Sequence, residues 1–300
     1  MGQLASRLRL AGAATLVVSL LALDAPGHAA FPGENGKIAY VRVAAGSDIF
    51  VINPNGTGER NITARARRSD VDPAWPADGM KIAFARLDSF NETTFDIWVM
   101  NADGSDQASL TDTPTEDDLD PAWSPDGSKI VFARRYASGD SDLFVLSASG
   151  TERQITFGPP DDFDPAWSPN GKLIAFSRNN RLHLMNADGS EVRRVTDYTE
   201  SESNPNWAPN GNRIVYAACV DNCQDVPDQD IFTVKPDGTE GVKLTDGPEM
   251  DGFPAWSPDG RRIAFTRFEG MFVMDADGSN LIQLTGSPNK RFFAPDWQPL

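Results

Sequence analysis

Acidic residues stand at or just before a phrase that recurs along this 300-residue chain. The phrase is typified by DPAWSPDGSKIVFAR at residues 120–134. The acids are Asp70, Asp72, Asp118, Asp120, Asp162, Asp164, Glu202 and Asp251. Carboxylates that gather at one place raise one another's pKa and attract cations, so the set could bind a metal ion or a basic partner.

A structural role is the alternative for each of these acids. An aspartate before proline can stabilise its own turn, and that alternative stays open for any single residue. Turn stabilisation does not require doubled acids in successive repeats, however, which favours a binding role for the whole set. The last repeat has Lys290 and Arg291 at this place, so we expect a lopsided ring that could orient a partner.

The elements that must position these acids follow from the spacing of the repeat. Its tryptophan recurs at intervals of 40 to 49 residues, at Trp75, Trp123, Trp167, Trp207, Trp256 and Trp297. Each unit contains strand-like runs separated by SPDG-type and ADGS-type turns, in which proline and glycine set the backbone. A period of this length with four short strands per unit predicts an all-β propeller.

The two ends of the chain complete one another. The first unit starts at FPGENGKIAYVR, where the spacing of Phe31 from Tyr40 matches that of Trp75 from Phe84, and it lacks most of a first strand. The chain ends on APDWQPL, which supplies a first strand alone. We therefore expect six four-stranded antiparallel blades over residues 31–300, closed by pairing the C-terminal strand with the N-terminal blade.

Several repeated residues are expected to serve packing. An arginine closes the second strand in most units, and an aspartate such as Asp48, Asp96, Asp142 or Asp230 opens the third, so cross-strand ion pairs between them are expected. One slot of the third strand is aromatic except at His183, which we expect to pack there without a catalytic or ligand role.

Variation between units lies in the loops from the second to the third strand and in those that lead to the next blade. The longest are residues 87–96 and 218–230. A rigid scaffold with variable loops on one face is expected to bind with that face. The first strands should line the central channel, which would place the acids at its mouth.

The unit PAWSPDGxKIAF…DIFVMNADGS…LT resembles the repeat of the TolB-type propellers, relatives of the WD-repeat class. The resemblance covers residues 31–300, without the α/β domain expected before a TolB propeller. It implies a protein-interaction platform in the cell envelope, with the channel mouth receiving a segment of the partner.

The N-terminal residues have the layout of a secretory signal peptide. Arg7 and Arg9 precede an apolar run that is too short to span a bilayer, and small residues follow. Cleavage after Ala29 or Ala30 is expected, which makes the protein periplasmic or extracellular. No later stretch is apolar enough to act as an integral membrane segment.

The net negative charge limits the classes of partner that the protein can bind. The chain has a net charge of −16, and residues 1–30 contribute one net positive charge (Arg7 and Arg9 against Asp24), so the remainder carries −17. Such a surface repels nucleic acid and anionic membranes and favours a protein or peptide of basic character. We expect a monomer.

Cys219 and Cys223 are the two cysteines, and in an exported chain a local disulfide is the leading interpretation. The same insertion carries acids that could hold a structural calcium ion: Asp221, Asp225, Asp228 and Asp230. No cofactor is required by the sequence, and calcium is the one that its residues allow.

Two classes of function compete. The first is a binding scaffold that uses the acidic loop face and the channel mouth. The second is a calcium-dependent propeller enzyme of the lactonase or lyase type, with carboxylates in the channel. The sequence favours the scaffold, because the first strands are alike from blade to blade, whereas catalytic sites need unlike residues in unlike roles.

Overall fold

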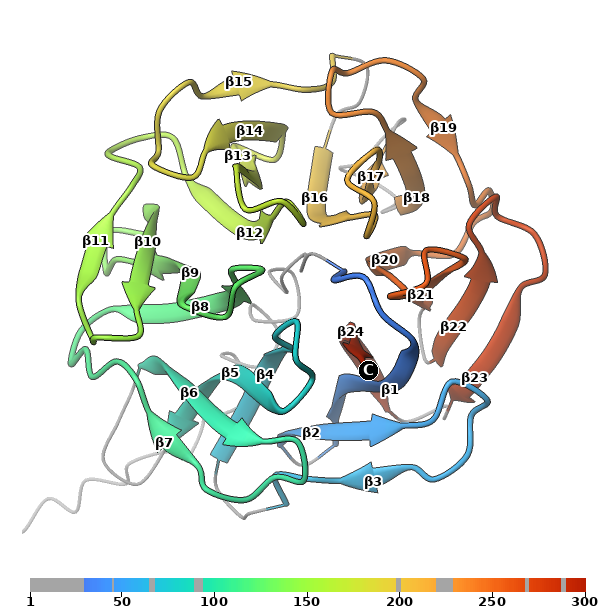
Figure 1. Cartoon of the computed structure of the whole chain (residues 1–300), viewed down its shortest axis with the longest axis horizontal. Helices are drawn as coiled ribbons and strands as arrows, with labels where there is room; N and C mark the ends of the chain where they lie inside the picture. The colour runs from blue at the N-terminus through green and yellow to red at the C-terminus, as the bar shows by residue number, and fades with distance from the viewer. Residues whose placement is uncertain are drawn as a thin grey trace, which may run out of the picture.

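The structure is a computed structural model that describes residues 30–44, 46–64, 68–88, 94–197, 201–219, 229–267, 270–286 and 290–300. Six four-stranded sheets stand around a central axis, each built from antiparallel neighbours (Figure 1). The predicted six-bladed propeller is thereby confirmed. The described ranges contain no helix with the length and apolarity needed to cross a membrane.

Each blade is ordered from its inner strand outward. Blade 1 consists of β24 (Arg291–Pro299), β1 (Asn35–Val43), β2 (Ser47–Ile52) and β3 (Arg60–Asn61). Blade 2 consists of β4 (Arg68–Ala74), β5 (Lys81–Asp88), β6 (Phe95–Asn101) and β7 (Ala108–Ser109). Blade 3 consists of β8 (Asp117–Trp123), β9 (Lys129–Arg135), β10 (Ser141–Ser147) and β11 (Glu152–Gln154).

The second half of the ring repeats this order. Blade 4 consists of β12 (Asp162–Trp167), β13 (Leu173–Arg178), β14 (Leu182–Asn186) and β15 (Arg193–Arg194). Blade 5 consists of β16 (Ser201–Trp207), β17 (Ile214–Cys219), β18 (Gln229–Val234) and β19 (Val242–Lys243). Blade 6 consists of β20 (Asp251–Trp256), β21 (Arg262–Arg267), β22 (Gly270–Asp275) and β23 (Ile282–Gly286).

Closure joins the two ends of the chain in blade 1, as expected. Strand β24 pairs antiparallel with β1, and Trp297 lies opposite Ile38 in the same way that Trp123 lies opposite Ile130 in blade 3. Glu34 and Leu300 then exchange backbone hydrogen bonds of 3.2 and 3.0 Å. The last residue of the chain is thereby held against the start of the first strand.

The inner strands are longer than the DPAW phrase and are kinked within it. In blade 3 the pairing of β8 with β9 shifts register between Leu119 and Ala122, and Asp120 has a φ of 56°. The cause is the following proline, which cannot donate to a ladder and is confined to bulges and edges. The same position has positive φ in every blade, at Asp72, Asp120, Asp164, Asn204, Phe253 and Ala294.

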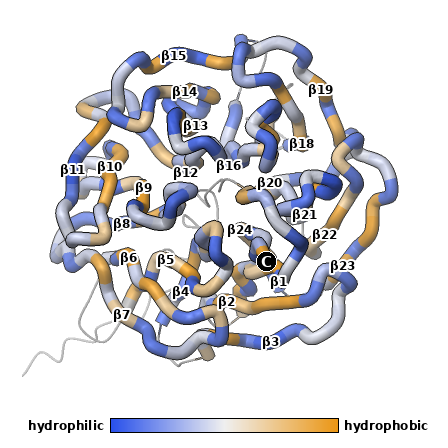
Figure 2. Tube along the Cα trace, in the orientation of Figure 1, coloured by the Kyte–Doolittle hydropathy of each residue, from blue (hydrophilic) through white to orange (hydrophobic). Residues whose placement is uncertain are grey.

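The core lies between the blades. Figure 2 shows hydrophobic residues along middle strands such as β2 and β10, whereas the outer strand β15 is hydrophilic. Two of the repeated tryptophans bridge neighbouring blades, because Trp123 Nε1 donates to the carbonyl oxygen of Ala74 and Trp207 Nε1 donates to that of Ala166, each at 3.2 Å. His183 packs as predicted, with its ring centroid 5.8 Å from that of Phe176.

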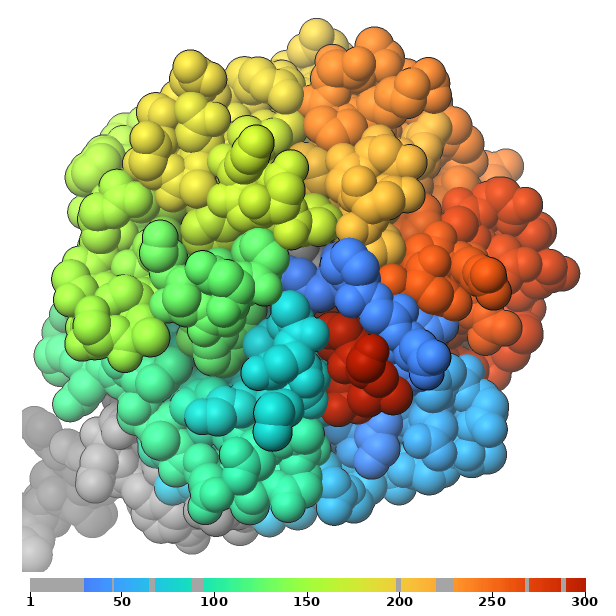
Figure 3. Space-filling view, in the orientation of Figure 1, coloured from blue at the N-terminus to red at the C-terminus, as the bar shows by residue number. Residues whose placement is uncertain are grey.

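The N-terminal segment (residues 30–34) crosses the end of the channel on the face that carries the SPDG-type turns, here called the turn face (Figures 1 and 3). The backbone N–H of Ala30 donates to the carbonyl oxygen of Trp207 at 3.2 Å, and that of Gly33 donates to Pro258 at 3.3 Å. The segment therefore contacts blades 5 and 6 before it enters blade 1.

Phe31 anchors this segment. Its spacing aligns it with the repeated tryptophans, but Trp297 takes that place in blade 1. Phe31 is instead 3 % exposed, in a hydrophobic cluster that includes Trp167 and Trp207. Its burial holds the segment against blades 4 and 5.

Candidate functional site

Four of the acids predicted to bind are buried in ion pairs within their own blades. Each accepts two hydrogen bonds from the arginine opposite it on the second strand. The Nε to Oδ1 distances are 2.6 Å for Arg86–Asp70, 2.7 Å for Arg134–Asp118, 2.6 Å for Arg178–Asp162 and 2.6 Å for Arg267–Asp251. These carboxylates are almost wholly buried, so each charge is offset inside the blade.

The expected arginine pairs with the third strand are wrong, and the register explains the difference. Arg86 lies opposite Asp70 on one side and opposite Asp96 on the other. The guanidinium forms its two-pronged contact with Asp70, and a fork of this kind satisfies both carboxylate oxygens at once. Asp96 instead accepts a hydrogen bond from the backbone N–H of Thr113 at 2.9 Å.

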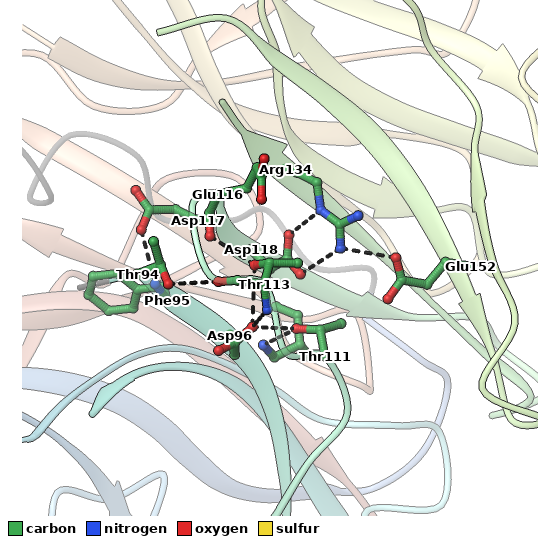
Figure 4. Close-up of polar contacts among 11 residues, drawn as sticks. Thr94, Phe95, Asp96, Thr111, Thr113, Glu116, Asp117, Asp118, Arg134 and Glu152 are labelled. Carbon is green, nitrogen blue, oxygen red and sulfur yellow. Dashed lines mark hydrogen bonds and ion pairs between the residues drawn. The ribbon is translucent and has the colours of Figure 1, made fainter. Parts of the chain in front are cut away.

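Figure 4 shows the equivalent pair of blade 3, Arg134 and Asp118, beside the contacts of Asp96 in blade 2. Arg134 contacts Asp118 and also Glu152, whose oxygen lies 3.0 Å from Nη2. Burial raises the pKa of Asp118 to about 6, although the Arg134 guanidinium opposes the shift. Burial likewise raises the pKa of Asp96, against the hydrogen bond from Thr113.

Glu202 departs from this pattern because blade 5 has Ala218 where the other blades have arginine. Its carboxylate reaches the preceding blade, where it accepts a hydrogen bond from the backbone N–H of Leu182 at 2.7 Å. The hydroxyl of Thr196 donates to the other oxygen. Glu202 is fully buried, so it joins two blades and does not face the solvent.

The remaining predicted acids, Asp72, Asp120 and Asp164, lie deeper along the channel wall. Asp120 accepts a hydrogen bond from the backbone N–H of Asp164 at 3.4 Å, and Asp164 accepts one from Asn204 at 2.9 Å. Each contact crosses from one blade to the next. All three aspartates are at most 3 % exposed, and Asp120 and Asp164 link neighbouring inner strands.

Two further polar residues also link neighbouring blades, and the sequence analysis did not identify them. Asn206 and Asp296 stand where the other repeats have alanine, two residues after the bulge. Asn206 Oδ1 accepts a hydrogen bond from the backbone N–H of Trp256 at 2.9 Å, and Asp296 Oδ2 accepts one from the backbone N–H of Trp75 at 2.7 Å. Burial raises the pKa of Asp296 well above its ordinary value. The phrases NPNW and APDW were the signal that could have revealed them.

A pocket lies between blades 3 and 4 on the face that carries the variable loops, here called the loop face. Its volume is about 220 Å³, and it is lined by Leu119, Asp120, Ala133, Arg135, Gly139, Ser141, Asp161, Phe163 and Asn180. Only Asp120 among these belongs to the predicted site. The others include the β9–β10 and β13–β14 connections, which the sequence indicated as binding loops.

The loop face also exposes apolar and acidic side chains. Phe157 is 73 % exposed on the connection from β11 to β12, and Met250 is exposed on the corresponding connection from β19 to β20. Asp140 and Glu249 are exposed on the same face. Exposed aromatic and acidic groups together are suited to a partner with apolar and cationic side chains.

The turn face is acidic in sequence, but its aspartates are held within their own turns. The Ser124 hydroxyl and the Ser128 N–H both donate to Asp126, and these bonds lower its pKa to about 2. Repeated turns of this kind account for most aspartates there. They stabilise the ionised carboxylate locally, as expected for turn residues.

The calcium and disulfide predictions fall largely outside the described residues, which exclude Asp221, Cys223, Asp225 and Asp228. Both therefore stay predictions. Asp230 is described, and the Lys243 ammonium lies 2.8 Å from its Oδ2. Within the described ranges, no three His, Cys, Asp or Glu side chains gather as metal ligands.

Comparison with known proteins supports the architecture. The sequence model of a family described as the TolB beta propeller domain matches residues 28–227. A search of curated proteins found no match.

Solved structures resemble the chain at low identity. TolB from Acinetobacter baumannii has a TM-score of 0.74 at 18 % identity, over 90 % of this chain and 68 % of that one. A putative TolB from Agrobacterium tumefaciens has a TM-score of 0.67 at 18 % identity, over 88 % and 99 %. An oligogalacturonate lyase from Vibrio parahaemolyticus has a TM-score of 0.57 at 13 % identity, over 88 % and 79 %. At these identities the likeness concerns the fold alone.

Proposed function

Because the chain belongs to the TolB beta propeller domain family, we propose that it is an exported scaffold whose loop face binds a protein or peptide of basic character. The difference between the two faces carries this proposal. The N-terminal segment crosses the channel end at the turn face, whereas the loop face has a pocket and exposed Phe157. A partner that approaches the channel would do so from the loop face.

The charge distribution supports a cationic partner, although with other residues than those first expected. The acids paired with arginines contribute little net field, whereas the exposed Asp112, Asp140 and Glu249 and the half-buried Asp161 contribute negative charge to the loop face. Lys290 and Arg291 stand beside blade 1, which makes the face asymmetric. Such a field steers association and fixes the orientation of a charged partner.

The leader-like N-terminus supports action outside the cytoplasm, in the periplasm or at the exterior. A monomeric state is part of the same proposal. The calcium-dependent enzyme has no comparable support among the described residues, since no acidic cluster there has metal-ligand geometry. Calcium at the 218–230 insertion stays a separate proposal. It is tested by thermal melting in calcium and in chelator, since a ligand of the folded state raises the midpoint.

The test compares two variants with equal charge change. Asp112→Asn, Asp140→Asn and Glu249→Gln are combined on the loop face. The control combines substitutions at turn positions where the chain itself uses Asn55: Asp103→Asn, Asp188→Asn and Asp237→Asn. The probe is a synthetic peptide of alternating lysine and glycine. Calorimetry measures its affinity for each variant.

The loop-face variant should bind the peptide more weakly, with a shallower dependence on salt, while the control stays close to wild type. The proposal is overturned if the control loses as much affinity as the loop-face variant. It is equally overturned if wild-type protein does not bind the peptide at low ionic strength.

A further inference from the structure

The pocket between blades 3 and 4 is built from two inner strands and two loops. Strand β8 contributes Leu119 and Asp120, and β12 contributes Phe163. Asp161 links the two blades, because its Oδ1 accepts a hydrogen bond from the backbone N–H of Ser141 at 3.3 Å. The pocket is therefore part of the folded scaffold and not a gap between independent loops.

The lining combines an apolar wall with oxygen acceptors. Leu119, Ala133 and Phe163 supply the apolar surface, and the backbone of Asn179 fixes Asp161 by donating to its carbonyl oxygen at 2.9 Å. Asp161, Ser141 and Asn180 contribute polar residues to the lining, whereas Asp120 is 1 % exposed and its Oδ2 accepts a hydrogen bond from the backbone N–H of Asp164. Long cationic side chains match such a lining, since their methylene stems cover apolar surface while the charged end reaches acceptors.

The one cation in the lining is already balanced. Arg135 Nη2 lies 2.8 Å from Asp117 Oδ2 within β8 and β9. An anionic ligand would have to compete with Asp117 for that guanidinium and approach Asp120 and Asp161 as well. A cationic group meets the opposite situation, because the half-buried carboxylate of Asp161 and the buried charge of Asp120 both attract it.

The size of the pocket limits what can occupy it. Its volume of about 220 Å³ lies below the ~300–1,000 Å³ of small-molecule sites. A single side chain of a docked protein therefore suits the pocket better than a free metabolite does.

We propose that this pocket is the specificity subsite of the loop face and receives one lysine side chain of the partner, with its ammonium at the carboxylate of Asp161. The assignment rests on the proposed function, since it names the group that the loop face selects. Phe157, on the connection that leads into Asp161, offers an apolar contact for residues beside that lysine.

The test uses the lysine–glycine peptide and a second peptide in which norleucine replaces lysine. Asp161→Asn keeps the acceptor for Ser141 but removes the charge, and should weaken lysine-peptide binding by about tenfold or more. Glu249→Gln removes the same charge from the same face outside the pocket, and should cost less than about fivefold. Asn180→Asp adds a carboxylate to the lining and should tighten binding. Carbodiimide coupling followed by mass spectrometry should join the peptide amine to Asp161.

The outcomes separate the two proposals. If Asp161→Asn and Glu249→Gln weaken binding equally, the pocket is not the subsite, while the loop face keeps its role. If the norleucine peptide binds as well as the lysine peptide, the ammonium is not recognised and the subsite assignment fails. Absence of any binding to wild-type protein contradicts both proposals. Melting curves of each variant verify that the fold is intact.

Discussion

The carboxylate of Glu202 accepts a hydrogen bond from the backbone N–H of Leu182 at 2.7 Å and thereby joins blade 5 to blade 4. In blades 2 and 3 the corresponding N–H is satisfied by a threonine hydroxyl, as Ile97 is by Thr111 at 2.9 Å. Two breaks in the repeat, Arg181 and Ala218, remove the usual aspartate and arginine from this junction. The longer Glu202 side chain compensates for both.

Glu202→Ala should therefore lower the free energy of unfolding by about 1–3 kcal/mol for each buried donor that loses its partner. Glu202→Gln keeps an oxygen acceptor and should cost less. Urea unfolding followed by circular dichroism measures both. Equal stability of Glu202→Ala and wild type would contradict the proposed link between the blades.

The buried pair Arg86–Asp70 is the second stability test, because neither side chain is exposed. Arg86→Met or Asp70→Ala alone should each cost about 3–5 kcal/mol, since each leaves one buried charge without its partner. The double variant should lose much less than the sum of the two. Strict additivity in the unfolding free energies would show that the pair is not coupled.

Asp296 should make stability depend on pH. Its pKa is raised by burial, so the folded state keeps a proton at pH values where the unfolded chain has released it. The contribution of Asp296 to the free energy of unfolding should thus be greatest at low pH. It should fall as the pH rises from about 3.9 toward the pKa of the folded state.

Asp296→Asn should remove this loss of stability at higher pH. An asparagine can accept the same hydrogen bond, because Asn206 accepts one from the backbone N–H of Trp256 between blades 5 and 6. We expect a higher melting temperature than wild type near neutral pH and little difference near pH 3. A lower melting temperature at neutral pH would count against a buried carboxyl group with a raised pKa.

Phe31 should stabilise the ring although it belongs to no strand. Phe31→Ala should cost about 3 kcal/mol, at the lower end for a buried phenylalanine, because the vacated site lies at a channel end where neighbours can relax. Pro32→Ala is the control, since Pro32 is exposed. Thermal unfolding that does not distinguish the two variants would show that the N-terminal segment is not anchored by Phe31.

The fold was predictable because its signals are periodic. The recurring tryptophan, the two turn types and the incomplete end repeats specify six blades and their closure. The partners of the arginines were not predictable, because a middle strand places Arg86 in register with Asp70 and with Asp96 alike. Side-chain geometry, which the repeat does not encode, decides between them.

The candidate site was harder to predict for a related reason. Doubled acids suggested an open ring. In the structure, one acid of each pair forms an ion pair with an arginine of its own blade. Acids of the channel wall accept hydrogen bonds from the next blade. The pocket forms where Asp161 meets Ser141 across two blades. A contact between blades leaves no fixed spacing in the sequence, so only the three-dimensional arrangement reveals it.

Hydrogen exchange with the lysine–glycine peptide bound tests the central claim most directly. Backbone amides in residues 136–141, 157–162 and 178–182 should exchange more slowly in the complex, because these segments surround the pocket on the loop face. Amides of the SPDG-type turns should be unchanged. Protection confined to the turn face, or to the N-terminal segment, would contradict a binding function of the loop face.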